Sequence, residues 1–353
     1  MPPSSSVCGD TQRVSAHVAA RASLDASITC RGMSVNNGAS AGQLARRAVD
    51  RWQAVAAGTR ARRFFRVHTI APGAIAVRIQ GDADVLARAG FAAQSGGVAG
   101  VPRRLAWIAL DPARFAGSVT RSDDLMDVHA APRARDGVTC VRLNGGYFNY
   151  RMRASAMAPE HVAIGPQRSG GGRPLPSLPV PEAFADDFRE IAFADGSSIS
   201  SAPMLSESGR ATFADHAAGH DRYRLPAGFD FDNGDQIAPG MLWHAADPNP
   251  RAAISVPSAP GDARVRLVAA PMNDRNHPGT GWRLTEFSHV TARIDRMERP
   301  ANTSLNLDGG ESVALMAWTD GVPCLQVSQT PVPRRVANLI EFTDALALRH
   351  GGT

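Results

Sequence analysis

The segment Thr303-Ser304-Leu305-Asn306-Leu307, followed directly by Asp308-Gly309-Gly310-Glu311-Ser312, carries the strongest fold signal in this sequence. A short β-forming run that ends in an acid and two glycines is typical of a strand entering a tight turn. Just before it, an apolar stripe at helical spacing over 284–297, stopped by Pro300, predicts a helix. A helix followed by a strand is the order found in an α/β unit, and such units place ligands at the carboxyl end of the strand. We therefore expect a ligand site at Asp308.

A second turn of the same kind lies in the first half of the chain. Val141-Arg142-Leu143 is strand-like and runs directly into Asn144-Gly145-Gly146-Tyr147-Phe148. Paired glycines at a strand end let the backbone approach a ligand closely. The alternative is a pair of ordinary β-turns, since Asn-Gly and Asp-Gly are the strongest hairpin dipeptides.

Short apolar runs bounded by Gly, Pro and Asp predict further strands along the chain. They are 63–69, 75–79, 104–110, 138–143, 251–256, 264–270, 303–307, 313–318 and 336–342. We predict an α+β or α/β fold with a mixed β-sheet core and flanking helices. Residues 1–40, rich in Ser, Ala, Gly and Asn, are expected to form a flexible leader, 41–62 an amphipathic helix, and 63–345 the main domain.

Composition restricts the class of protein. An apolar fraction of 43% and a charged fraction of 20% fit a soluble globular chain. No apolar run reaches the roughly 18 residues that a membrane-spanning helix needs, and Met1–Ser6 lacks the features of a secretory signal peptide. The formal charge is +5, but the arginines are scattered. This pattern favours a solvated basic surface over a nucleic-acid interface, and it would attract an anionic substrate.

The 38 basic residues are all arginine, since the sequence contains no lysine. GC-rich coding is one explanation, because Ala, Arg, Gly and Pro are also abundant. The other is selection against lysine, the site of ubiquitination, in a bacterial protein that works inside a host cell. Together with the Ser-rich leader, the second explanation predicts export by a specialised secretion system. The alternative location is the cytoplasm.

In order and context, these motifs resemble those of the phosphodiester glycosidase family, which includes the lysosomal "uncovering enzyme" and exopolysaccharide-related bacterial proteins. The resemblance spans about residues 63–345 and rests mainly on Asn306–Ser312. The supporting motifs are Asn144–Phe148, Ser201–Leu205, Pro250-Arg251, Asn273-Asp274-Arg275, Gly281–Phe287 and Arg335–Leu339.

The resemblance implies hydrolysis of a glycosyl phosphodiester or a related sugar linkage. Such a site needs cations for the phosphate, a carboxylate at the anomeric carbon and amides for sugar hydroxyls. Asp308 is the expected nucleophile or general base, with Glu311 as its acid partner. The remaining expected site residues bind the phosphate, bind the sugar or hold Asp308 in place. They are Arg251, Arg275, Asn144, Asn306, Gly145, Gly146, Gly309, Gly310 and Ser312.

Two middle motifs depart from the family pattern. Asn249-Pro250-Arg251-Ala252 stands where the family has His-Pro-Arg-Thr, and Asn273-Asp274-Arg275 where it has Asp-Gly-Arg. The departures motivate an alternative function, in which an altered family member binds a host protein or an envelope partner. No cofactor is indicated, and a divalent cation held by oxygen ligands around Asp308 is neither shown nor excluded by the sequence.

Overall fold

The computed structural model describes residues 27–30, 50, 65–91, 101–133, 137–149, 162–213, 223–224, 227–228, 230, 242–258, 264–272, 280–298, 302–331 and 334–350. The predicted helix over 41–62 lies outside these residues except at Asp50. Most of the predicted leader over 1–40 lies outside them too. Its described part, Ser27–Cys30, forms strand β1 and pairs in parallel with strand β7 (Arg189–Phe193).

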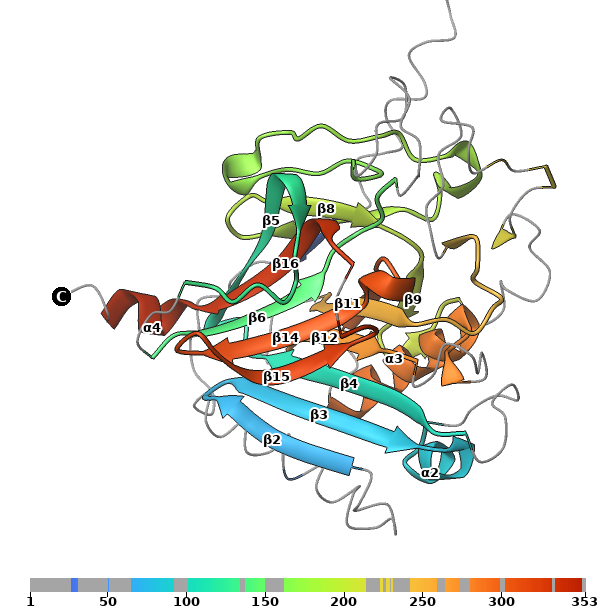
Figure 1. Ribbon diagram of the computed structural model, residues 1–353, viewed down its shortest axis with the longest axis horizontal. Helices are drawn as coiled ribbons and strands as arrows, with labels where there is room; N and C mark the ends of the chain where they lie inside the picture. Colours follow the sequence, from blue (N-terminus) through green and yellow to red (C-terminus); the bar gives the residue numbers. More distant parts are fainter. Residues whose placement is uncertain are drawn as a thin grey trace, which may run out of the picture.

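The described strands form three sheets (Figure 1). The largest contains, in spatial order, β10 (Arg210–Ala211), β9 (Met204–Glu207), β13 (Asn302–Asn306), β11 (Arg251–Pro257), β12 (Val265–Ala270), β4 (Arg103–Leu110), β3 (Ala74–Gly81) and β2 (Phe65–Ala71). The second contains β15 (Val322–Ser328), β14 (Ala314–Thr319), β6 (Thr139–Asn144), β16 (Val336–Asp344) and β5 (Phe115–Met126). The third contains β1, β7 (Arg189–Phe193) and β8 (Ser198–Ser201). Every pairing within the two larger sheets is antiparallel.

The predicted α+β or α/β class, with a mixed sheet and flanking helices, is wrong, because the described fold is mostly β-sheet. Its α-helices are α2 (Ala83–Arg88), α3 (Leu284–Glu298) and α4 (Ala345–His350), and only α3 is long. Helix α3 does precede β13 as predicted, but β13 pairs antiparallel with both β11 and β9. The expected parallel α/β unit is therefore absent from this part of the described chain.

The central strands are apolar on both faces because each face of the eight-stranded sheet is covered. Successive side chains of a strand point to opposite faces. In β4, Leu105 and Trp107 belong to the core on one face, while Ile108 and Leu110 belong to the core that also includes residues of β6, β14 and β16. The second core lies between the eight-stranded and five-stranded sheets. The two sheets thus form a β-sandwich.

Helix α3 covers the other face of the eight-stranded sheet (Figure 1). Its predicted apolar stripe is confirmed, since Phe287, Val290 and Ile294 are buried in the core that contains Trp107. The first turn is fixed by Glu286, whose carboxylate accepts a hydrogen bond from the Arg283 N–H at 3.0 Å, in the manner of a capping box.

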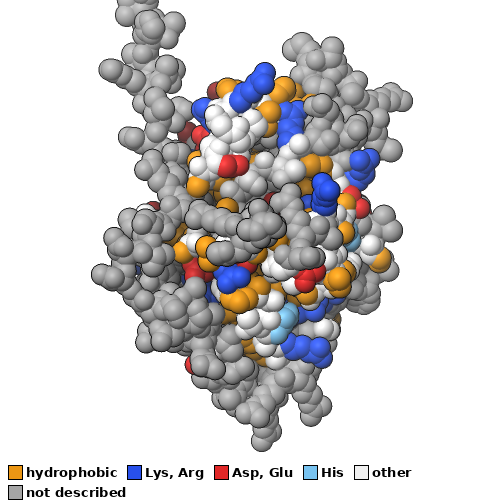
Figure 2. All heavy atoms as spheres, turned by 90° about the vertical axis from the view of Figure 1, so that its left-hand side faces the viewer, with side chains coloured by type: hydrophobic (Ala, Val, Ile, Leu, Met, Phe, Trp, Pro, Cys, Tyr) orange, Lys and Arg blue, Asp and Glu red, His pale blue; other side chains and the backbone are white. Residues whose placement is uncertain are grey.

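Basic side chains lie at several separate places on the face of the molecule in Figure 2. Because the chain contains no lysine, all of them are arginines. No helix within the described ranges combines the length and the apolar character that crossing a bilayer requires.

Candidate functional site

The two glycine turns predicted from the sequence meet in the structure. The Asn144 side-chain amide donates a hydrogen bond to the Asp308 carbonyl at 2.7 Å, and the Asp308 N–H donates to the Gly145 carbonyl at 3.1 Å. Asn144 Oδ1 in turn accepts from the Ala314 N–H at 3.2 Å. Because β6 belongs to one sheet of the sandwich and β13 to the other, these bonds join the two sheets at the Asp308 turn.

The paired glycines of the first turn approach other parts of the protein. A Cβ atom on Gly145 would lie 1.8 Å from Asn338 Oδ1, and one on Gly146 would lie 2.5 Å from the Ser200 carbonyl oxygen. Asn338 also binds this turn, since its backbone carbonyl accepts from the Gly145 N–H at 3.1 Å and its Oδ1 from the Gly146 N–H at 2.9 Å. Close packing within the protein therefore accounts for both glycines.

Replacing Gly145 with Ala is expected to destabilise the protein by about 1–3 kcal/mol, the usual range for an overpacked buried site. The added methyl group must displace Asn338 Oδ1, which breaks its bond to the Gly146 N–H. Urea denaturation measures the change. Gly170→Ala is the matched control, because a Cβ there makes only an ordinary contact, 3.4 Å from Asp195 Oδ2. Equal stability of the two variants would contradict the packing argument.

Asp308 is a nearly buried carboxylate, 6% exposed. Burial raises the pKa of Asp308 from 3.8 to about 6, against smaller lowering effects of the Ser312 hydroxyl, Arg334 and the Gly309 N–H. The Ser312 hydroxyl lies close enough to affect this pKa. Its oxygen is buried and makes no hydrogen bond of ordinary geometry within the described part of the chain.

Asn306 and Tyr147 lie beside Asp308. The Asn306 side-chain amide donates to the Tyr147 hydroxyl at 2.5 Å, to the Ala202 carbonyl at 2.9 Å and to the Leu307 carbonyl at 3.0 Å. Burial, and then the charge of Asp308, raises the pKa of Tyr147, and the charge of Arg251 opposes the rise. Tyr147 is therefore within electrostatic reach of both charged groups.

Arg251 enters the same region, within electrostatic reach of Tyr147. Its side chain is fully buried, with Nε donating to the Trp282 carbonyl at 2.9 Å and one terminal nitrogen donating to the carbonyls of His244 at 2.8 Å and Asp247 at 2.9 Å. Burial lowers the pKa of Arg251 to about 10. The guanidinium thus ties backbone segments together, and its expected role as a phosphate clamp stays a prediction.

The remaining predicted residues lie in three different settings. Gly309 and Gly310 form the Asp308 turn, where the Gly310 N–H donates to the Pro250 carbonyl at 3.2 Å. Glu311 is 44% exposed at its side chain and pairs with Arg334 at 3.5 Å. Arg275 lies outside the described residues.

Arg334 was not among the predicted site residues. It contacts Glu311 and lowers the pKa of Asp308, while its side chain remains 25% exposed. The available sequence signal was the Arg334-Arg335 pair directly before the strand β16. It identified a basic cluster but could not place that cluster beside Asp308.

Two further observations concern metal ligands and cavities among the described residues. Within the described residues, no group of three or more His, Cys, Asp or Glu side chains is arranged to hold a metal ion. A cavity of about 940 Å³ lies elsewhere, against β2, β3, β4 and β15, and none of the predicted site residues lines it.

Asp308 should make stability depend on pH. An acid whose pKa is higher in the folded state holds its proton more tightly there. The contribution of Asp308 to stability is therefore highest below pH 3.8, and it falls as the pH rises to about 6. The difference corresponds to about 3 kcal/mol. Asp308→Asn is therefore expected to be more stable than the wild type by about 1–3 kcal/mol at pH 7–8. This advantage should disappear below pH 4.

Urea denaturation of both proteins at a series of pH values tests this expectation. Glu311→Gln is the control, because a half-exposed carboxylate should change stability by no more than about 0.5 kcal/mol. If the stability difference between Asp308→Asn and the wild type does not change with pH, the burial of an ionised Asp308 is refuted.

Comparison with known proteins adds little to this description. No family model matches the chain, and no curated protein matches it. A solved structure from Burkholderia pseudomallei K96243, described only as a candidate exported protein, is 13% identical, with a TM-score of 0.45. The similarity covers 79% of this chain and 96% of that one. The described residues themselves define a β-rich fold with a buried carboxylate where the two larger sheets are joined.

Proposed function

We propose that this protein hydrolyses a glycosyl phosphodiester, a diester of a sugar 1-phosphate, or a related sugar linkage, with Asp308 as the acting carboxylate. The observation that carries the proposal is a buried acid at a strand end whose pKa is raised to about 6. Asn144 holds the backbone of that residue from the neighbouring sheet. Strongly perturbed acids held in this way are candidates for functional groups.

The raised pKa suits proton transfer near neutrality. A general base works best when its pKa lies close to the working pH. Asp308 would take a proton from water as the water oxygen attacks the anomeric carbon. The bond from that carbon to the phosphate oxygen then breaks, and its electron pair leaves with the phosphate. Because phosphate is a good leaving group, a strong acid partner matters less than in ordinary glycosides.

Arg334 is a better candidate than Arg251 for contact with the phosphate. Its guanidinium is partly exposed and lies near both Asp308 and Glu311. A guanidinium suits bidentate binding of phosphate. We assign Arg251 a positioning role, since its described bonds hold His244, Asp247 and Trp282.

The experiment is a hydrolysis assay with the purified full-length chain. The substrates are a glycosyl phosphodiester, the matching p-nitrophenyl glycoside and the matching sugar phosphate monoester. We expect release of free sugar from the phosphodiester at a higher kcat/KM than from the other two. If the protein neither cleaves nor binds any of the three, the proposal fails.

The burial of Arg251 also favours a second candidate function. The Arg251 guanidinium, which the resemblance led us to expect as a phosphate clamp, donates to the backbone carbonyls of Trp282, His244 and Asp247. In this alternative, the protein binds a host or envelope partner without cleaving it. Binding of the phosphodiester with no sugar released, together with recovery of a specific partner in a pull-down, would favour this function over hydrolysis.

A further inference from the structure

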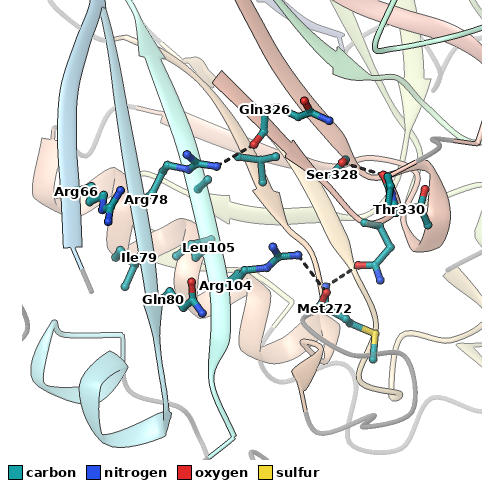
Figure 3. A pocket seen from close by; sticks show the side chains of 14 residues that line it. Arg66, Arg78, Ile79, Gln80, Arg104, Leu105, Met272, Gln326, Ser328 and Thr330 are labelled. Atoms are coloured by element: carbon teal, nitrogen blue, oxygen red, sulfur yellow. Dashed lines mark hydrogen bonds between the residues drawn. The ribbon is translucent and has the colours of Figure 1, made fainter. Parts of the chain in front are cut away.

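The cavity of about 940 Å³ is lined by a cluster of basic side chains (Figure 3). Arg66, Arg78 and Arg104 come from the three neighbouring strands β2, β3 and β4. Among the described residues that line the cavity there is no Asp or Glu. Arg78 and Arg104 extend toward the opposite wall, which is formed by the end of β15 and the segment that follows it (Figure 3).

These arginines occupy positions that normally face the interior of a sandwich. In β3, Ala74 and Ala76 belong to the core between the two sheets, and alternation places Arg78 on that same face. In β4, Ile108 and Leu110 belong to that core. Arg104 lies an even number of residues from them and therefore on the same face of the sheet. The inner face of the eight-stranded sheet therefore changes from apolar to basic along its strands, and the cavity lies over the basic part.

Arg78 and Arg104 each donate one hydrogen bond to a backbone carbonyl, of Gln326 at 2.8 Å and of Met272 at 3.3 Å, but no acidic side chain among the described lining residues balances their charge. Arg66 and Arg78 are direct partners across β2 and β3, where like charges repel. The Arg104 Nε atom is buried and has no hydrogen-bond partner among the described residues. Burial, and then the charge of a neighbouring arginine, lowers the pKa of both Arg78 and Arg104. A bound anion would remove this repulsion and supply the missing acceptor.

The remaining lining residues include apolar ones, such as Leu105 and Met272, and several with uncharged hydrogen-bonding side chains. Gln80 is the register partner of Arg104, and Gln326, Ser328 and Gln329 lie on the opposite wall. Amide and hydroxyl side chains of this kind bind sugar hydroxyls. The volume is at the upper end of the range of about 300–1,000 Å³ for small-molecule sites, which leaves room for more than one sugar unit.

We propose that this cavity binds an anionic oligosaccharide, whose phosphate or carboxylate groups contact Arg78 and Arg104 and whose hydroxyls contact the glutamine and serine side chains. The site is separate from Asp308, and binding there does not require that Asp308 cleave anything. A short stretch of chain connects the cavity with the region of Asp308. Gln329 donates its N–H to the Val313 carbonyl at 2.9 Å, and Arg334, five residues later, pairs with Glu311.

Isothermal titration calorimetry on the full-length protein tests the proposal with four probes. Tetragalacturonate carries carboxylates, fructose 1,6-bisphosphate carries phosphates, maltotetraose is neutral, and inorganic phosphate lacks a sugar. The variants are Arg78→Gln and Arg104→Gln. Arg173→Gln is the matched control, because Arg173 is exposed and does not line the cavity. Thermal midpoints establish that each variant folds.

We expect at least one anionic sugar to bind more tightly than both maltotetraose and inorganic phosphate. Arg78→Gln and Arg104→Gln should each weaken that binding about 10-fold or more, the loss of a charge-assisted hydrogen bond, and Arg173→Gln should not. Equal binding of neutral and anionic sugars, binding of phosphate as tight as that of the sugars, binding unchanged in both variants, or no binding would each overturn the proposal. Cleavage plays no part in this readout, so its failure is distinguishable from failure of the proposed hydrolysis.

Discussion

Asp308→Asn is expected to lower kcat/KM on a glycosyl phosphodiester by about 10²-fold or more. General-base catalysis typically contributes about 10²–10⁴-fold, and the side chain of Asn has no proton-accepting carboxylate. The substitution changes few contacts, because Asn has nearly the same shape as Asp. The Asn144 bond to the backbone of residue 308 is also retained, since it uses the carbonyl oxygen.

Glu311→Gln separates the two acids of this turn. The Glu311 side chain is 44% exposed and paired with Arg334, so its loss should lower kcat/KM by about 10-fold or less. Circular dichroism and thermal midpoints establish that both variants fold. A larger loss for Glu311→Gln than for Asp308→Asn would transfer the main catalytic role to Glu311, and our assignment would be wrong.

Asp295→Ala is expected to cause the largest loss of stability. Asp295 on α3 is fully buried and accepts hydrogen bonds from Ser206 at 2.8 Å, Ser304 at 2.9 Å, Ser255 at 2.7 Å and Arg266 at 2.7 Å. The four donors come from the adjacent strands β9, β13, β11 and β12. Each donor residue is paired directly with the donor residue of the next strand in this order. The Asp295 carboxylate therefore holds α3 over a row of four polar side chains that crosses the sheet.

Removing that carboxylate leaves the buried Arg266 without the charge that Asp295 supplied and three serines without their acceptor. Breaking a buried ion pair from one side costs about 3–5 kcal/mol, a large share of the roughly 5–15 kcal/mol that stabilises a typical protein. Urea denaturation or the thermal midpoint measures the loss. Asp84→Ala, at an exposed position of α2, is the matched control and should cost less than about 1 kcal/mol.

A double variant tests whether the cost comes from the unpaired charge. Asp295→Leu with Arg266→Met removes both charges, and should be less destabilised than the sum of the two single variants. If Asp295→Ala is as stable as Asp84→Ala, the buried carboxylate does not hold α3 on the sheet.

The strands that sequence patterns predicted well are those with apolar runs. Strands β4, β11, β12 and β14 carry such runs, and the structure confirms each of them close to its predicted bounds. The strands that were missed are polar or interrupted. Strand β15 contains Pro323 and the 65%-exposed Val322, features that an edge strand tolerates.

The predicted fold class was wrong because the helix-then-strand order over 284–307 indicated an α/β unit, and the apolar runs did not exclude one. A strand that is apolar on both faces is typical of a parallel sheet covered by helices. Here one cover is α3 and the other is a second antiparallel sheet, as the alternation of Trp107 and Ile108 between two cores shows. A local pattern records that a face is buried, but it does not record whether a helix or a sheet buries it.

The candidate site was predictable only in part. The contact between Asn144 and Asp308 was anticipated, because both residues end strands in matching turns. The burial of Arg251 was not, since its partners His244 and Trp282 lie in irregular segments whose geometry the sequence does not reveal. The arginine-lined cavity was missed because it depends on the registers of three strands, which the sequence does not reveal.

The pH dependence of kcat/KM on a glycosyl phosphodiester, measured for the wild type and for Asp308→Asn, is the most direct test of Asp308 as the acting base. We predict that the wild-type value rises with pH through about 6, where Asp308 loses its proton. The Asn variant should lack this rise and be about 10²-fold or more slower. A folded Asn variant that keeps both the rate and the rise near pH 6 would contradict this role of Asp308.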